Sequence, residues 1–164
     1  FEELKAIGWT RRVPRFVAAE VSGSLPAALA SGDPMPPVTT RNVPTIATSI
    51  GAAQGTVQSL DVLRKTNGAA VTVEDDEMRR WVVKLAAKEG IWPEASSAAP
   101  FAAIEHLRAK GTIKPNERSV ALLTAAGLKD PGPIEQALPE PPVVNGGLKE
   151  LMAALKNSYG FNHG

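Results

Sequence analysis

The sequence predicts an α/β fold built on a parallel sheet with flanking helices. Three short apolar runs, residues 14–20, 69–73 and 119–124, have the length and composition of strands that are buried on both faces. Segments with helical periodicity lie between them, which is the alternation that parallel βαβ units require. A chain of 164 residues with 43% hydrophobic content is long enough to fill one core.

The clearest helix is predicted for residues 74–89. Its apolar side chains recur at the spacing of one buried helical face, and they are Met78, Trp81, Val82, Leu85 and Ala86. Four acidic residues, 74–77, begin the segment and Gly90 follows it. Because negative charge is favourable at the N-terminal end of a helix, we interpret the acidic run as part of a helix cap and not as a cation site.

Weaker patterns predict the remaining elements. Further helices are expected at residues 1–7, 25–30, 57–65, 96–110 and 148–156. Residues 33–45 contain four prolines and little apolar periodicity, so they are expected to form a loop. A second proline-rich stretch begins at residue 139. We therefore divide the chain into a body, residues 1–138, and a tail, residues 139–164, which packs on the outside or on a neighbouring subunit.

Composition excludes several classes of function. The chain has 18 Lys and Arg against 17 Asp and Glu, without a basic stripe, so nucleic acid is not an expected partner. Cysteine is absent, which excludes disulfides and thiolate chemistry and fits a reducing compartment such as the cytoplasm. No apolar run reaches the roughly 20 residues of a membrane span. Phe1 stands where an initiator Met is usual, so we expect the chain to begin in the middle of a protein.

The residues alone give few candidates for chemistry. The common nucleotide-binding, hydrolase and metalloprotease motifs are absent. His106 and His163 are isolated, and Lys129 is expected to form a surface ion pair with the adjacent Asp130. Ligands bind at the carboxyl ends of parallel strands, so Glu20 and Thr124, each at the end of an apolar run, are the positions of interest.

Four stretches, read in order, resemble threonine synthases and related fold-type II pyridoxal-phosphate enzymes of the tryptophan synthase beta-like superfamily. Phe1-Glu-Glu-Leu, followed by the strand of residues 14–20, is similar to the region after the family's phosphate-binding loop. Residues 45–50, Thr-Ile-Ala-Thr-Ser-Ile, resemble a T-I-A-x-x-I segment, and residues 90–99 resemble an E-P-[SA]-[SG]-A-A region. Residues 123–130, Leu-Thr-Ala-Ala-Gly-Leu-Lys-Asp, are similar to the threonine synthase [LS]-T-[GA]-x-G-L-K-[DF] motif. The resemblance covers most of residues 1–138 and implies the C-terminal part of that catalytic fold.

The resemblance also implies a cofactor, pyridoxal 5'-phosphate, and residues that bind it. The Thr124 hydroxyl aligns with the group that bonds the pyridine nitrogen, with Ala125 beside it, and Glu94 aligns near the edge of the ring. Ser96 and Ser97 are either functional or structural, with Ser96 a candidate helix cap. The Schiff-base lysine and the glycine-rich phosphate loop are expected upstream of Phe1, so no catalytic residue is assigned here. Ser24 and Pro26 replace the metal ligands of some relatives, so a metal is not expected.

The implied activity is that of a threonine synthase, which converts O-phospho-L-homoserine and water to L-threonine and phosphate. Ala95, Ala125 and Ala126 depart from the family motifs. The Gly-Leu-Lys-Asp ending favours the synthase, but most contacts to the substrate phosphate are expected upstream of Phe1, so other activities stay open. One alternative is a threonine or serine dehydratase or a cysteate synthase on the same scaffold. Another is a non-catalytic fragment that complements its N-terminal half. The expected partners are an amino-acid substrate, the missing N-terminal half and a second copy in a homodimer.

Overall fold

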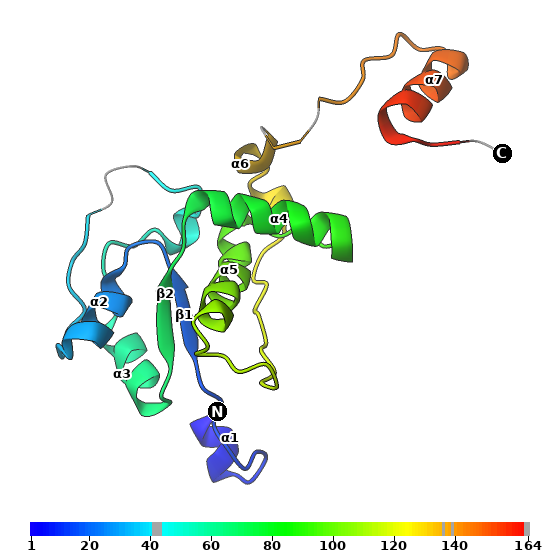
Figure 1. Ribbon diagram of the computed structural model, residues 1–164. Helices are drawn as coiled ribbons and strands as arrows, with labels where there is room; N and C mark the ends of the chain where they lie inside the picture. Colours follow the sequence, from blue (N-terminus) through cyan, green and yellow to red (C-terminus); the bar gives the residue numbers. More distant parts are fainter. Residues whose placement is uncertain (41–43, 136, 139, 163–164) are drawn as a thin grey trace.

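The computed structural model describes residues 1–40, 44–135, 137–138 and 140–162, and it has a small parallel sheet between layers of helices (Figure 1). Strand β1 (Val17–Glu20) pairs with β2 (Ala69–Thr72) in parallel, with Val17 opposite Ala69. The connection between them contains α2 (Ser24–Ser31) and α3 (Val57–Lys65), as a parallel pair requires. The predicted fold class, α/β with a parallel sheet and flanking helices, is confirmed.

Helices cover both faces of this sheet. On one face α2 and α3 enclose a small apolar cluster made of Leu25, Ala28, Leu60 and Leu63. On the other face α4 (Asp75–Glu89) and α5 (Ala95–Ala109) enclose the larger cluster, which includes Val71, Val73, Met78, Ala99, Ala102 and Leu107. The alanines let α5 approach the strands closely, so the beginning of α5 is held firmly against the sheet.

Helix α4 begins with the capping box that its acidic start predicts. The side chain of Glu77 accepts a hydrogen bond from the backbone amide of Glu74 at 2.9 Å, and Gly90 ends the helix in the left-handed conformation. The predicted buried face is correct for Met78, Val82 and Leu85. It is wrong for two positions: Trp81 is half-buried, because its indole is directed toward a polar partner on α5, and Ala86 is exposed.

The predicted strand at residues 119–124 is wrong. These residues run as irregular chain, and the side chains of Val120 and Leu122 are 86% and 71% exposed. A strand requires a neighbour that accepts its backbone hydrogen bonds, and β1 and β2 pair with each other in the part of the chain that the structure describes. The apolar run therefore has strand composition without a strand's partner.

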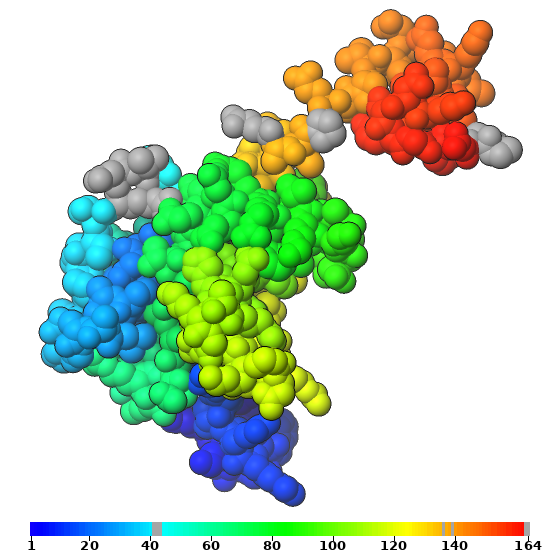
Figure 2. Space-filling view, in the orientation of Figure 1, coloured from blue at the N-terminus to red at the C-terminus, as the bar shows by residue number. Residues whose placement is uncertain are grey.

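The remaining elements are short. They are α1 (Glu2–Ala6), two 3-10 turns named η1 (Thr48–Ile50) and η2 (Gly127–Lys129), α6 (Gly132–Glu135) and α7 (Leu148–Tyr159). Helix α7 forms a separate lobe beyond α6 (Figure 2). Part of the loop predicted at 33–45 lies outside the described residues, and so does His163. The structure describes no helix that is long and apolar enough to cross a membrane.

Candidate functional site

The candidate site lies where the start of α5 meets the segment that follows Thr124. An isolated antiparallel bridge joins Pro93 to Ala126. On either side of it, the amide of Glu94 donates to the carbonyl of Ala125 at 3.0 Å, and the amide of Gly127 donates to the carbonyl of Trp92 at 2.8 Å. Two of the motifs that carry the resemblance are thus joined by their backbones.

A close contact explains why glycine occupies position 127. A Cβ atom built there would lie 2.3 Å from Nε1 of the Trp92 indole, far inside van der Waals contact. Glycine is required because the backbone of η2 lies directly on this ring. The backbone conformation does not require glycine, since the φ angle of Gly127 is not positive. The Gly-Leu-Lys-Asp motif therefore has a packing role at its first residue.

Ser97 connects the two predicted cofactor-binding residues at the end of the apolar run. Its hydroxyl accepts a hydrogen bond from the amide of Ala125 at 3.0 Å and lies 3.0 Å from the hydroxyl of Thr124. Ser97 is 1% exposed, whereas the side chain of Thr124 is exposed. A buried residue of α5 thus fixes the position of an accessible hydroxyl.

Glu94, the third predicted residue, lies at the cap position of α5 with only 4% of its surface exposed. Its carboxylate accepts hydrogen bonds from the Nζ of Lys129 at 2.9 Å, from the hydroxyl of Ser49 at 2.7 Å and from the hydroxyl of Ser96 at 3.3 Å. The hydrogen bond from Lys129 is the main reason why the pKa of Glu94 is lowered, with Ser49 next, so the carboxyl group stays ionised.

Two sequence interpretations are corrected by this cluster. Lys129 pairs with Glu94 and not with Asp130, because η2 turns the lysine back toward the start of α5. The Ser96 hydroxyl donates to Glu94 and makes no helix cap, since the helix begins one residue earlier, at Ala95. Sequence reasoning missed Ser49 as a member of the site, although it lies in the Thr-Ile-Ala-Thr-Ser-Ile segment that carries part of the resemblance.

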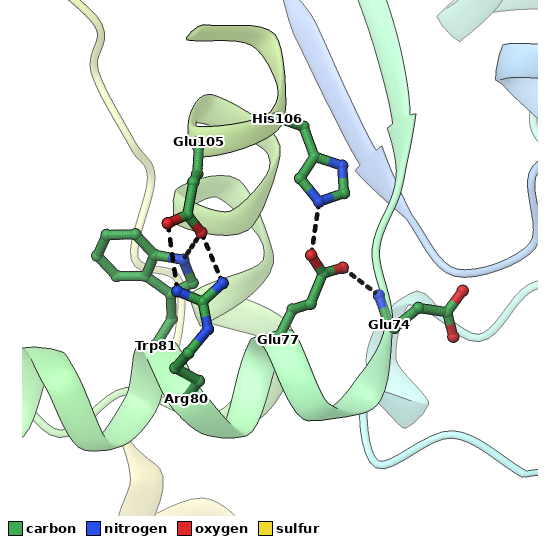
Figure 3. A network of polar contacts seen from close by, with 6 residues as sticks. All are labelled: Glu74, Glu77, Arg80, Trp81, Glu105 and His106. Carbon is green, nitrogen blue, oxygen red and sulfur yellow. Dashed lines mark hydrogen bonds and ion pairs between the residues drawn. The ribbon is translucent and has the colours of Figure 1, made fainter. Parts of the chain in front are cut away.

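The far half of α5 is held to α4 by the polar network of Figure 3. Nε2 of His106 lies 2.5 Å from Oε1 of Glu77, whose other oxygen accepts from the amide of Glu74. The guanidinium of Arg80 binds Glu105 with two hydrogen bonds, of 2.6 and 3.2 Å. The network thus joins the far half of α5, at Glu105 and His106, to α4.

Glu20 has a structural role at the end of β1. Its carboxylate accepts the amide of Leu25 at 2.8 Å, at the start of α2. Burial raises the pKa of Glu20, and the backbone amides around it oppose the shift. The strand-end carboxylate of Glu20 thus accepts a hydrogen bond from the first turn of α2. Among the predicted residues, Thr124 and Glu94 are the ones that lie together around the start of α5.

All nine lysines of the chain are exposed, so none has the buried surroundings that lower the pKa of a Schiff-base lysine. Within the described residues no group of three metal-ligating side chains comes together.

A family model described as pyridoxal-phosphate dependent enzyme matches residues 2–125. The chain belongs to this family. The match includes Glu94, Ser97, Thr124 and Ala125. It confirms the fold-type II relationship that the motifs indicated, and pyridoxal phosphate is the cofactor of the family.

Several threonine synthases are similar to this member of the pyridoxal-phosphate dependent family. That of Methanosarcina acetivorans is 32% identical over 158 residues, which cover 94% of this chain and 39% of the relative. That of Methanocaldococcus jannaschii is 32% identical over 162 residues, or 95% of this chain and 39% of the relative. That of Halalkalibacterium halodurans is 36% identical over 89 residues. The chain spans about two fifths of the length of the first two relatives.

Proposed function

We propose that this chain forms the pyridine side of the cofactor site of a threonine synthase. The whole enzyme would convert O-phospho-L-homoserine and water to L-threonine and phosphate. The observation that carries the proposal is the arrangement of Ala125, Ser97 and Thr124, in which a buried serine presents an exposed hydroxyl inside the segment that matches the family. The relatives named threonine synthase support the choice of reaction.

The partners of Ser97 permit an arrangement of hydrogen bonds in which Thr124 keeps its proton for a ligand. Its oxygen accepts the amide of Ala125, so its own proton is available to the oxygen of Thr124 at 3.0 Å. When Ser97 donates in this way, the proton of Thr124 is free to point away from the protein. Thr124 then offers one donor to an acceptor such as a pyridine nitrogen.

A neutral hydroxyl suits this family's cofactor at that position. Pyridoxal phosphate, when bound, supplies an electron sink for charge that develops on the substrate carbons. Thr124 would donate a hydrogen bond to the ring nitrogen without transferring a proton, which keeps the sink weak and favours elimination and replacement at the β and γ carbons. Glu94 does not compete for the nitrogen, because its carboxylate is occupied by Lys129 and Ser49.

The residues described here fit one end of the cofactor. Thr124 and Ala125 would contact the pyridine ring. Glu94, which follows the Pro93–Ala126 bridge, would lie near the edge of the ring. The exposed lysines do not fit the role of the lysine that holds the cofactor aldehyde. We therefore propose that other residues of a longer enzyme supply this lysine and the phosphate-binding loop. We also propose that residues 1–138 belong to the catalytic body and that residues 139–164 form a tail.

Product analysis on the longer enzyme distinguishes the proposed reaction from its alternatives. Incubation with O-phospho-L-homoserine is expected to release phosphate and L-threonine in equal amounts. A dehydratase would instead form a 2-oxo acid and ammonia from L-threonine or L-serine, and a cysteate synthase would consume sulfite with O-phospho-L-serine. Either of these results without threonine formation would replace the proposed reaction.

The statement that no lysine of this chain holds the cofactor is tested on the 164-residue chain itself. We expect that borohydride treatment with pyridoxal phosphate, followed by peptide mapping, labels the exposed lysines weakly and without preference. Stoichiometric labelling of one lysine, together with turnover, would contradict our assignment.

We also propose two partners, which are the N-terminal half of the enzyme and a second copy in a homodimer. We propose a cytoplasmic location as well, because the sequence has no cysteine.

A further inference from the structure

The chain contains two Asn-Gly pairs, Asn67-Gly68 and Asn145-Gly146. The asparagine of such a pair can lose its side-chain amide without an enzyme, because the backbone nitrogen of the glycine can attack the asparagine Cγ. A carbon–nitrogen bond forms, the side-chain nitrogen leaves as ammonia, and a five-membered succinimide remains. Glycine favours the attack because it has no Cβ to obstruct it. In a folded protein the reaction also requires that the glycine nitrogen is free and that its peptide can rotate.

The first pair is held in place just after α3. The amide of Gly68 donates to the carbonyl of Leu63 at 2.7 Å, and the next amide, of Ala69, donates to the carbonyl of Phe16 at 3.1 Å. Asn67 has a left-handed backbone, with a φ angle of 50°. A Cβ atom at Gly68 would lie 2.3 Å from the carbonyl oxygen of Phe16, so this backbone is closely packed. The Gly68 nitrogen is therefore withheld from Asn67, although that residue is exposed.

The second pair, in the segment before α7, has none of these restraints. Residues 141–150 are all exposed, and the segment lies away from the sheet and from α4 and α5 (Figure 1). A Cβ atom at Gly146 or at Gly147 would meet no atom within 4 Å. In the part of the chain that the structure describes, the Asn145 side chain and the Gly146 amide have no hydrogen-bond partner. The backbone amide of Asn145 donates to the carboxylate of Glu150 at 3.2 Å, which leaves both reacting atoms free.

We propose that Asn145 is a site of spontaneous deamidation and isomerisation, and that Asn67 is protected from the same reaction by the fold. One water opens the succinimide at either of its two carbonyl carbons, which gives aspartate or isoaspartate. Both products carry a carboxylate, so the segment before α7 gains one negative charge. In isoaspartate the backbone runs through the side-chain carbon, which adds one atom inside the loop that the Asn145–Glu150 hydrogen bond closes. The reaction needs no cofactor and does not depend on the proposed function.

Peptide mapping of the folded protein after incubation in mildly alkaline buffer tests the proposal, with Asn67 as an internal control. We expect Asn145 to convert to aspartate and isoaspartate, at a rate that rises with hydroxide concentration because the Gly146 nitrogen must lose its proton. Asn67 reacts only in molecules in which the end of α3 has opened, so we expect it to be at least about tenfold slower. In denaturant the two asparagines should react at similar rates. Electron-transfer fragmentation distinguishes isoaspartate from aspartate.

Two variants test the role of the glycine nitrogen. Gly146→Ala is expected to slow the conversion of Asn145 several-fold, because the methyl group obstructs the attack. Gly147→Ala is the matched control, since it adds the same methyl group one residue further along and should leave the rate unchanged. A folded protein that forms no isoaspartate at Asn145 would overturn the proposal, and so would equal rates at Asn145 and Asn67 in the folded protein.

Discussion

The hydroxyl of Ser97, in the first turn of α5, lies 3.0 Å from the hydroxyl of Thr124, 27 residues further along the chain. The same Ser97 oxygen accepts the amide of Ala125, so one buried side chain holds two successive residues of the threonine synthase-like motif. Thr124 would otherwise lie at the end of an irregular, exposed segment. Its position is set by α5 and not by a strand of its own.

Ser97→Ala is expected to destabilise the protein by about 1–3 kcal/mol, because it leaves the Ala125 amide without its acceptor. Urea unfolding measures the change. Ser96→Ala is the matched control, since the Ser96 hydroxyl makes a longer contact, 3.3 Å, to a carboxylate that has other donors. Equal effects of the two substitutions would show that Ser97 does not hold the segment.

Gly127→Ala is expected to cost about 1–3 kcal/mol, because the added methyl group overlaps the Trp92 ring and forces one of them to move. Gly132→Ala serves as the control, since a Cβ there meets its nearest neighbour, Asp130, at 3.9 Å. Thermal unfolding of both variants, with tryptophan fluorescence as the probe, checks the prediction. A neutral Gly127→Ala would contradict the packing of η2 on this ring.

Lys129→Met removes the main partner of the Glu94 carboxylate, and its effect should depend on pH. The pKa of Glu94 is lowered in the folded protein, so its contribution to stability is present above the ordinary value of 4.5 and is lost as the pH falls through the lowered pKa. We expect Lys129→Met to be less stable than the parent near pH 7, by about 1 kcal/mol because the lysine is exposed. The difference should shrink in acid, and a pH-independent difference would exclude the ion pair as its cause.

Glu20 should show the opposite dependence. Its pKa is raised by burial, so its contribution favours the folded state below 4.5 and is lost as the pH rises through the raised value. Glu20→Gln keeps an oxygen acceptor for the Leu25 amide and should match the parent in acid but exceed its stability near pH 7. Glu20→Ala, which removes the acceptor, should be less stable at both pH values. Chemical denaturation at pH 4 and pH 7 gives the comparison.

Local patterns predicted the helices well. The predicted bounds of α3, residues 57–65, are those observed, because apolar spacing and the Asn67-Gly68 turn act within a few residues. The start of α4 was predicted from its acidic residues for the same reason. The capping box joins two residues that are three positions apart, Glu74 and Glu77, so a short stretch of sequence is enough to predict it.

Features that depend on distant partners could not be predicted in the same way. The apolar run at 119–124 has the composition of a strand, but composition does not specify a neighbouring strand. Lys129 has an acidic neighbour in sequence, Asp130, but it binds Glu94, 35 residues away. The reason is that η2 and the Pro93–Ala126 bridge direct the lysine side chain toward the start of α5. Trp81 follows the apolar period and still turns its indole nitrogen to Glu105. The family motifs named Thr124, Glu94 and Ser97, and the fold shows that Ser97 contacts Thr124 and that Ser49 binds Glu94.

Thr124 is proposed to donate a hydrogen bond to the pyridine nitrogen of the cofactor. The most direct measurement is the ¹⁵N chemical shift of pyridoxal phosphate labelled at that nitrogen and bound to the longer enzyme. We predict that Thr124→Val moves the resonance to that of a nitrogen without a donor, and that Thr124→Ser, which keeps the hydroxyl, leaves it near the parent value. A bound cofactor whose resonance is the same in Thr124→Val as in the parent would contradict the claim.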